Sequence, residues 1–144
     1  MINISVVIAD PRKATRTSYS KQLHPEKGIQ VVAEVGTERE MVEALKLRPR
    51  ILLLDGRMFG LSEVPLLPLI RRYSPQTKVI LLTGRIGPLR LVHALAGGVR
   101  GYLERALARS VLAKAVRMVD KGEVWVSRAV VPLLVSVLSR ITLP

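Results

Sequence analysis

The sequence predicts an α/β domain built on a parallel sheet, and two features of the 144-residue chain carry this prediction. Short apolar runs rich in valine, isoleucine and leucine alternate with longer, more polar segments of helical length. Continuous apolar runs are typical of strands buried on both faces of a parallel sheet. Because 49% of the residues are hydrophobic, the single domain expected from this length can bury a core of its own.

Five strands are expected, at residues 4–9, 29–35, 51–54, 79–82 and 99–103. The second differs from the others because Gln30 and Glu34 interrupt its apolar run, which is typical of an edge strand with one wetter side. Strands that alternate with helices favour right-handed crossovers. An edge-like second strand favours the order 2-1-3-4-5, and hence a flavodoxin-like, doubly wound sheet.

The segments between the strands have the lengths and capping signals of helices. Thr37-x-x-Glu40 is a capping box that opens a helix through Leu47, and Pro88 is well placed at the first position of another. The segment 12–23 is unusually polar for a helix. Pro68 should kink or shorten a helix over residues 61–73, whereas Pro65 is tolerable if Ser62 is the cap. The remaining helices are expected from Pro88 onwards, at 107–119 and at 127–141.

Four polar residues follow the predicted strands and should meet on one rim of the sheet, where ligands bind in open α/β folds. They are Asp10, Asp55, Thr83 and Arg105. Each alone has a commoner structural role, such as a helix cap, a strand residue or a surface charge. Together they form a set that suits a phosphoryl group: a carboxylate to accept it, a hydroxyl to hydrogen-bond it and a cation to balance its charge.

The motifs around these positions resemble the receiver domain of two-component response regulators over about residues 3 to 126, with details closest to the LuxR-type (NarL/FixJ-like) transcription regulators. The resemblance implies that Asp55 is the phosphoacceptor, that Thr83 is the switch hydroxyl and that Tyr102 is the aromatic switch residue. The motifs are Ile8-Ala9-Asp10, Leu53-Leu54-Asp55-x-Arg57-Met58-x-Gly60, Leu81-Leu82-Thr83 and Arg100-Gly101-Tyr102-Leu103.

Two departures from the family's pattern indicate an atypical phosphorylation pocket. Pro11 replaces the second of two adjacent acidic residues, which leaves Asp10 and Asp55 as the carboxylates for Mg²⁺. Arg105 replaces a lysine, and its longer planar group is able to pair directly with Asp55. We therefore expect weak magnesium binding, slow or absent phosphorylation and a pocket held by an Asp55–Arg105 contact.

Other basic residues should crowd the same pocket, namely Arg12, Arg57 and Arg85, and could neutralise its carboxylates without a metal. Two alternatives remain open at this point. One is an ordinary phosphoacceptor receiver that uses Asp55 with magnesium. The other is a small-ligand-binding doubly wound domain that uses the same rim, although the sequence has no glycine-rich phosphate loop to support a nucleotide site.

The charge balance is strongly basic, with 23 Lys+Arg against 11 Asp+Glu and a net charge of +12. The basic residues are spread along the chain, aromatic residues make up only 3%, and no helix-turn-helix signature appears. We expect weak, non-specific DNA binding by this chain, and sequence-specific binding only through a helix-turn-helix domain that it does not contain. The absence of cysteine excludes disulfides and thiol chemistry, and no signal peptide or membrane span is recognised.

The expected organisation is a receiver domain at 1–126 followed by an interface or linker helix at 127–144. That last segment is apolar on nearly every side, so it either folds back on the domain or contacts a partner. We favour a homodimer or another apolar contact through Val131, Leu134, Val135 and Leu138. A non-enzymatic signalling role in the cytoplasm, with a histidine kinase as a possible partner, completes the expectation.

Overall fold

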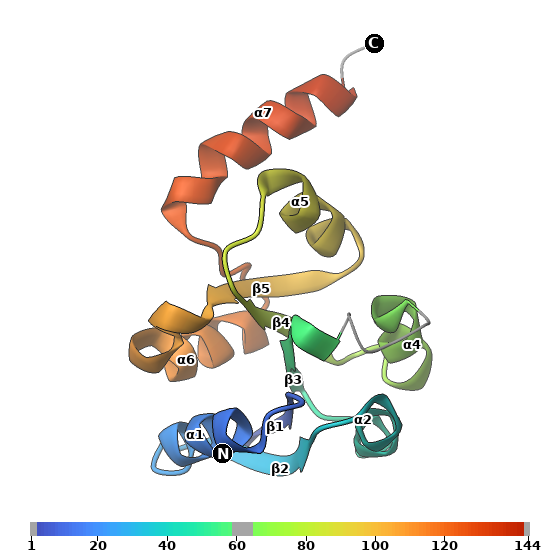
Figure 1. Ribbon diagram of the computed structural model, residues 1–144, viewed down its shortest axis with the longest axis vertical. Helices are drawn as coiled ribbons and strands as arrows, with labels where there is room; N and C mark the ends of the chain where they lie inside the picture. Colours follow the sequence, from blue (N-terminus) through green and yellow to red (C-terminus); the bar gives the residue numbers. More distant parts are fainter. Residues whose placement is uncertain (1–2, 59–64, 143–144) are drawn as a thin grey trace.

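A computed structural model describes residues 3–58 and 65–142 and confirms the predicted sheet. Its five strands are all parallel and lie in the order β2-β1-β3-β4-β5 (Figure 1). Because β1 and β3 are neighbours at the centre, the chain changes direction between them, and their carboxyl ends lie side by side. The strands are β1 (Ile4–Ala9), β2 (Ile29–Val35), β3 (Ile51–Asp55), β4 (Lys78–Thr83) and β5 (Val99–Glu104).

Helices cover both faces of the sheet. The sheet separates the core into two apolar clusters, one on each face. Helices α1 and α6 pack on one face, and α2, α4 and α5 pack on the other (Figure 1). The central strand β3 is buried along its whole length, which explains its uninterrupted apolar sequence. The helices are α1 (Lys13–Leu23), α2 (Glu38–Leu45), α4 (Leu66–Tyr73), α5 (Pro88–Ala96), α6 (Arg105–Asp120) and α7 (Val131–Thr142), with a 3₁₀ turn at Arg128–Val130.

The helix starts largely follow the capping signals. The hydroxyl of Thr37 accepts a hydrogen bond from the backbone N–H of Glu40 (3.1 Å), and Pro88 opens α5. Helix α4 begins only at Leu66, with Pro68 in its first turn, where a missing N–H costs no helical hydrogen bond. The expected shortening is therefore confirmed, whereas the proposed cap at Ser62 lies outside the described residues.

The end of the chain folds back on the domain and leaves apolar side chains exposed on its outer side. After α6 the chain runs beside β5, where Trp125 donates its N–H to the carbonyl of Arg100 (2.9 Å), and α7 then packs against α5 (Figure 1). Leu134 is partly buried against the core, and its expected contact with a partner stays a prediction. Val131, Val135 and Leu138 remain 44%, 56% and 51% exposed.

No helix in the described part of the chain has the length and apolar character that a membrane span needs.

Candidate functional site

The carboxyl rim of the sheet brings together the two aspartates that the sequence singled out. Asp10 follows β1 directly, and Asp55 is the last residue of β3. Both are almost completely buried, with 1% and 0% of their surface exposed. Because burial disfavours a carboxylate that has no partner, both side chains require strong hydrogen-bond donors.

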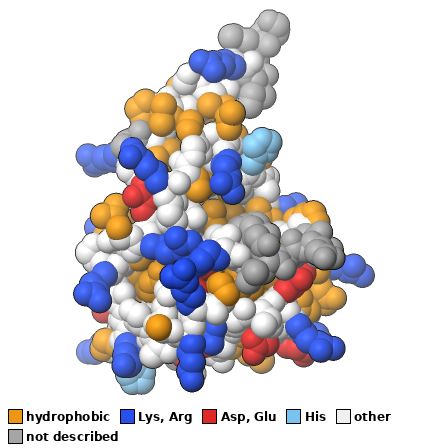
Figure 2. Space-filling model, in the orientation of Figure 1, with side chains coloured by type: hydrophobic (Ala, Val, Ile, Leu, Met, Phe, Trp, Pro, Cys, Tyr) orange, Lys and Arg blue, Asp and Glu red, His pale blue; other side chains and the backbone are white. Residues whose placement is uncertain are grey.

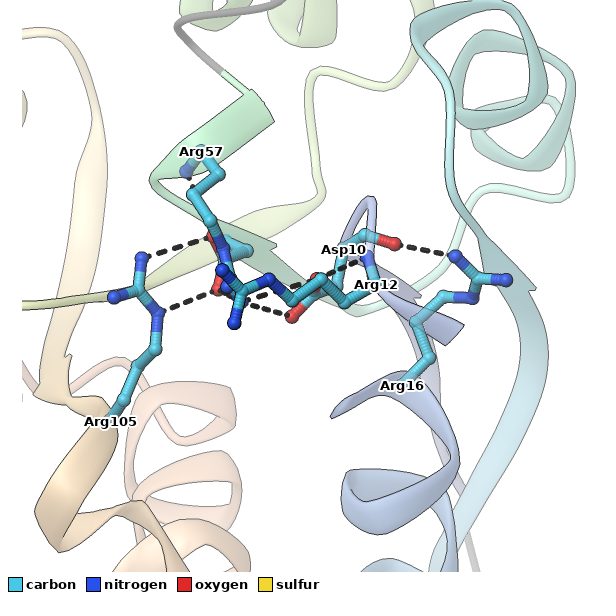
Figure 3. A network of polar contacts seen from close by, with 6 residues as sticks. Asp10, Arg12, Arg16, Arg57 and Arg105 are labelled. Atoms are coloured by element: carbon cyan, nitrogen blue, oxygen red, sulfur yellow. Dashed lines mark hydrogen bonds and ion pairs between the residues drawn. The ribbon is translucent and has the colours of Figure 1, made fainter. Parts of the chain in front are cut away.

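The guanidinium groups of Arg57 and Arg105, which Figure 3 labels, supply the side-chain donors for Asp55. Arg57 donates its backbone N–H and Nε to Oδ1, both at 2.8 Å, and Nη2 to Oδ2 at 3.0 Å. Arg105, the first residue of α6, donates Nε to Oδ2 at 2.9 Å and Nη2 to Oδ1 at 3.2 Å. Each carboxylate oxygen thus accepts from both arginines, and the expected Asp55–Arg105 contact is present. We call Asp55, Arg57 and Arg105 the arginine clasp.

Arg57 also links the clasp to Asp10. Its Nη2 lies 3.3 Å and 3.4 Å from the two oxygens of Asp10, and the backbone N–H of Arg12 donates to Oδ1 of Asp10 at 2.8 Å. The neighbouring Arg16 donates Nη1 to the Asp10 carbonyl oxygen at 2.7 Å (Figure 3). One guanidinium therefore occupies the space between two buried carboxylates.

The electrostatics of the two aspartates differ because the donors are unequally shared. Burial raises the pKa of Asp55, but the hydrogen bonds from Arg57 and Arg105 outweigh it and bring the pKa down to about 2. Burial raises the pKa of Asp10, and the bond from Arg12 and the charge of Arg57 offset this only in part. Burial and the nearby charges of Asp55 and Asp10 also raise the pKa of Tyr19 on α1. The clasp thus holds Asp55 as a carboxylate more firmly than Asp10.

The two expected switch residues lie beyond the clasp. Thr83 ends β4 beside Gly56, where a Cβ would come within 2.7 Å of the Thr83 Oγ1, so glycine is required by this close approach. Among the hydrogen bonds of the described residues, none joins Thr83 to Asp55. The ring of Tyr102 is buried, and its hydroxyl donates to the carbonyl of Gly84 and accepts from the N–H of Ile86, each at 3.4 Å.

The sequence predicts the positions of some arginines near the pocket but not of others. Arg57 was expected only as one of three neutralising residues, but it makes more contacts with the aspartates than Arg105 does. The prediction that Arg85 crowds the phosphorylation pocket is wrong. Arg85 lines a pocket near Tyr102 and α7, and among the described contacts it has none with either aspartate. Arg16 and Tyr19 were missed, since no sequence pattern shows that α1 places them against the rim.

In this arrangement arginine donors occupy the carboxylate oxygens that a magnesium ion would use. Magnesium needs oxygen ligands in a near-octahedral shell, usually with one or two carboxylates that are free to bind it. Here the oxygens of Asp55 face two guanidinium groups, Arg57 separates Asp55 from Asp10, and Pro11 offers no side-chain ligand. Within residues 3–58 and 65–142, no group of three or more acidic or histidine side chains has the placement of a metal site.

Comparison with known proteins identifies the family. Residues 6–117 match the response regulator receiver domain. The response regulator VraR of Staphylococcus aureus is 30% identical over 123 residues, which are 85% of this chain and 59% of VraR. The chain thus spans somewhat over half the length of this curated relative.

Two solved structures have the same fold. The isolated receiver domain of RcsB from Salmonella enterica serovar Typhimurium, in its apo form, gives a TM-score of 0.82 at 28% identity and covers 92% of this chain and 98% of that one. The receiver domain of NarL from Mycobacterium tuberculosis gives 0.76 at 27% identity, with 85% and 100% covered. The chain therefore belongs to the response regulator receiver family and is a receiver domain of the LuxR/NarL type.

Proposed function

We propose that this domain is a non-enzymatic signalling module in which the arginine clasp takes the place of magnesium and makes phosphorylation of Asp55 slow or absent. The observation that carries the proposal is that both oxygens of Asp55 accept hydrogen bonds from Arg57 and Arg105. Under this proposal Thr83 and Tyr102 retain the positions of switch residues but do not respond to a phosphoryl group.

The chemistry of phosphoryl transfer supports this proposal. Asp55 would attack the phosphorus of a phosphoryl donor with an oxygen lone pair as the bond from phosphorus to the donor's leaving group breaks, and the transferred group carries roughly −1.5 to −2 charge units that must be neutralised. In the clasp those lone pairs are directed at guanidinium donors, and these bonds are charge-assisted and strong. Attack would therefore require at least one arginine to leave a buried carboxylate, which adds to the barrier.

The main alternative is an ordinary phosphoacceptor receiver in which Asp10, Asp55 and water bind magnesium. It is favoured by the closeness of the two aspartates, since Nη2 of Arg57 reaches both. The two readings differ in what limits magnesium binding. In the alternative, the side chain of Arg57 moves away from the aspartates when magnesium binds. In our proposal, the clasp and the lack of a carboxylate at Pro11 both weaken magnesium binding.

A magnesium titration of four proteins tests the proposal: wild type, Pro11→Asp, Arg57→Met and the double variant. We expect weak binding by the wild type, tighter binding by Pro11→Asp, and the tightest binding by the double variant, because it gains a ligand and loses a competing cation. The readout is the chemical-shift change of backbone amides around Asp55. Equal, sub-millimolar-class binding by wild type and Pro11→Asp would refute the proposal.

Intact mass after incubation with acetyl phosphate and magnesium measures the phosphorylation itself. The wild type should gain little or no phosphoryl mass, and the double variant should gain it faster. Asp55→Asn is the control, because mass gained by this variant marks modification elsewhere. Complete phosphorylation of the wild type within minutes would favour the ordinary phosphoacceptor.

The wider role follows from the relatives and belongs to the same proposal. RcsB has been solved bound to DNA, both as a complex and as two dimers on parallel DNAs. By analogy, this receiver would control transcription in the cytoplasm through a helix-turn-helix domain outside the chain, with a histidine kinase as a possible partner. We assign residues 1–126 to the receiver and 127–144 to an interface or linker helix that supports a homodimer.

A further inference from the structure

A groove between α1 and α6 lies next to the arginine clasp, and apart from Arg105 its lining has no part in the function proposed so far. It has a volume of about 370 Å³, within the size range of small-molecule sites. The two helices pack side by side on one face of the sheet (Figure 1). Its polar lining consists of Thr15, Ser18, Tyr19 and Gln22 from α1 and Arg105 and Arg109 from α6.

The groove is basic and rich in hydrogen-bond donors. Arg105 and Arg109 are four residues apart on α6, so their side chains lie on the same face of the helix. Across the groove, Thr15 and Ser18 are three residues apart on α1 and add two hydroxyl groups. None of the described residues that line the groove carries a carboxylate, and α1 itself contains no acidic residue.

The groove is also held at a fixed width. The side-chain amide of Gln22 on α1 donates to the carbonyl of Ala108 on α6 at 3.1 Å, which ties the two helices together. Tyr19 lines the groove and is buried. A group of basic side chains covers the middle of the molecular face seen in Figure 2. A preformed width reduces the ordering that a ligand has to impose.

Arg105 belongs to both the groove and the clasp. Its Nε and Nη2 bind Asp55, while its side chain lines the groove and is 32% exposed. An anion in the groove would attract the same guanidinium that neutralises Asp55. Asp55 uses two of the five N–H donors of Arg105, so an anion in the groove would compete with Asp55 for the charge and the position of the same guanidinium.

We propose that the groove binds a small phosphate-type anion, such as the phosphate group of a phosphorylated metabolite, and that binding draws Arg105 away from Asp55. Two guanidinium groups and two hydroxyls form a donor set that suits tetrahedral phosphate oxygens. The ligand would then regulate the clasp without phosphorylating Asp55. This inference does not depend on whether Asp55 is a phosphoacceptor.

Calorimetric titration of the 144-residue chain with pyrophosphate at constant ionic strength tests the proposal. We expect saturable binding to the wild type and a loss of at least about tenfold in affinity for Arg109→Gln, because a charge-assisted contact is removed. Arg117→Gln is the matched control: it removes the same charge from the same helix, at a position that pairs with Glu26 (2.9 Å) outside the groove. Its affinity should stay close to that of the wild type.

A second variant tests the competition for Arg105. Asp55→Asn removes the carboxylate that holds Arg105, so pyrophosphate should bind this variant severalfold more tightly than the wild type. Equal losses in Arg109→Gln and Arg117→Gln would overturn the groove as the site and leave only a response to net charge. Unchanged affinity in Asp55→Asn would overturn the coupling, and an absence of saturable binding to the wild type would overturn the proposal as a whole.

Discussion

The sheet rim and the C-terminal helix depart from ordinary protein surfaces in opposite ways. At the rim, Asp10 and Asp55 are charged groups that lie buried, and arginines compensate them. On α7, Val131, Val135 and Leu138 are apolar groups that lie exposed. The buried carboxylates of the rim have their charge partners within the chain, whereas α7 leaves apolar surface that another molecule could cover. We therefore expect a partner to bind at α7 more readily than a metal at Asp55.

The comparison also separates two kinds of energy. Replacing both partners of a buried ion pair by apolar residues changes the free energy of unfolding little. Removing only one partner lowers it by several kcal/mol, because the other charge stays buried and unpaired. Exposed apolar groups cost little to truncate in the isolated chain, because water already surrounds them. Single substitutions should therefore have large effects at the rim and small effects on the outer side of α7.

The largest effect is expected from Arg57→Met, which leaves Asp55 with one guanidinium partner and Asp10 with none. The free energy of unfolding at neutral pH should fall by about 3 kcal/mol, as for other buried pairs that lose one partner. Urea denaturation followed by circular dichroism measures it. Lys46→Met is the control, because Lys46 pairs with Glu43 on the surface and should matter little. Similar stability losses in both variants would remove the distinction between the rim and the surface.

The sheet could be predicted from the sequence because its signals are local. The apolar runs that end at Asp10, Asp55 and Thr83 gave the strands, and the interrupted run with Gln30 and Glu34 gave the edge. Parallel strands then fix which residues share a rim, so the meeting of Asp10, Asp55 and Arg105 followed from topology.

The details of the site could not be predicted because they depend on side-chain directions. Both Arg57 and Arg85 follow strands at the rim, yet only Arg57 turns back over its own strand end to reach the aspartates. On α7, an almost uniformly apolar sequence gave no sign that Leu134 would face the core. Such choices are set by tertiary packing, which a single sequence does not display.

The next effect is an acid-dependent loss of stability at the rim. The pKa of Asp55 is lowered from 3.8 to about 2 on folding, so its contribution is complete above pH 4 and is lost as the pH falls towards 2. The loss from Asp55 amounts to about 2 kcal/mol, and the raised pKa of Asp10 opposes part of it. Urea denaturation at several pH values between 2 and 5 should show a weaker pH dependence for Asp55→Asn. Parallel curves for the two proteins would contradict the assignment.

The smallest effects should come from α7, where two leucines on one helix test the comparison directly. Leu134→Ala removes a side chain that packs towards the core and should lower the free energy of unfolding by about 1 kcal/mol, since the site is only partly buried. Leu138→Ala, at a position that is 51% exposed, should cost less than about 0.5 kcal/mol in the monomer. If a second copy covers the outer side of α7, light scattering should instead show that Leu138→Ala weakens the dimer more than Leu134→Ala does. A strict monomer at high concentration, for the wild type as well as both variants, would mean that no second copy covers this surface.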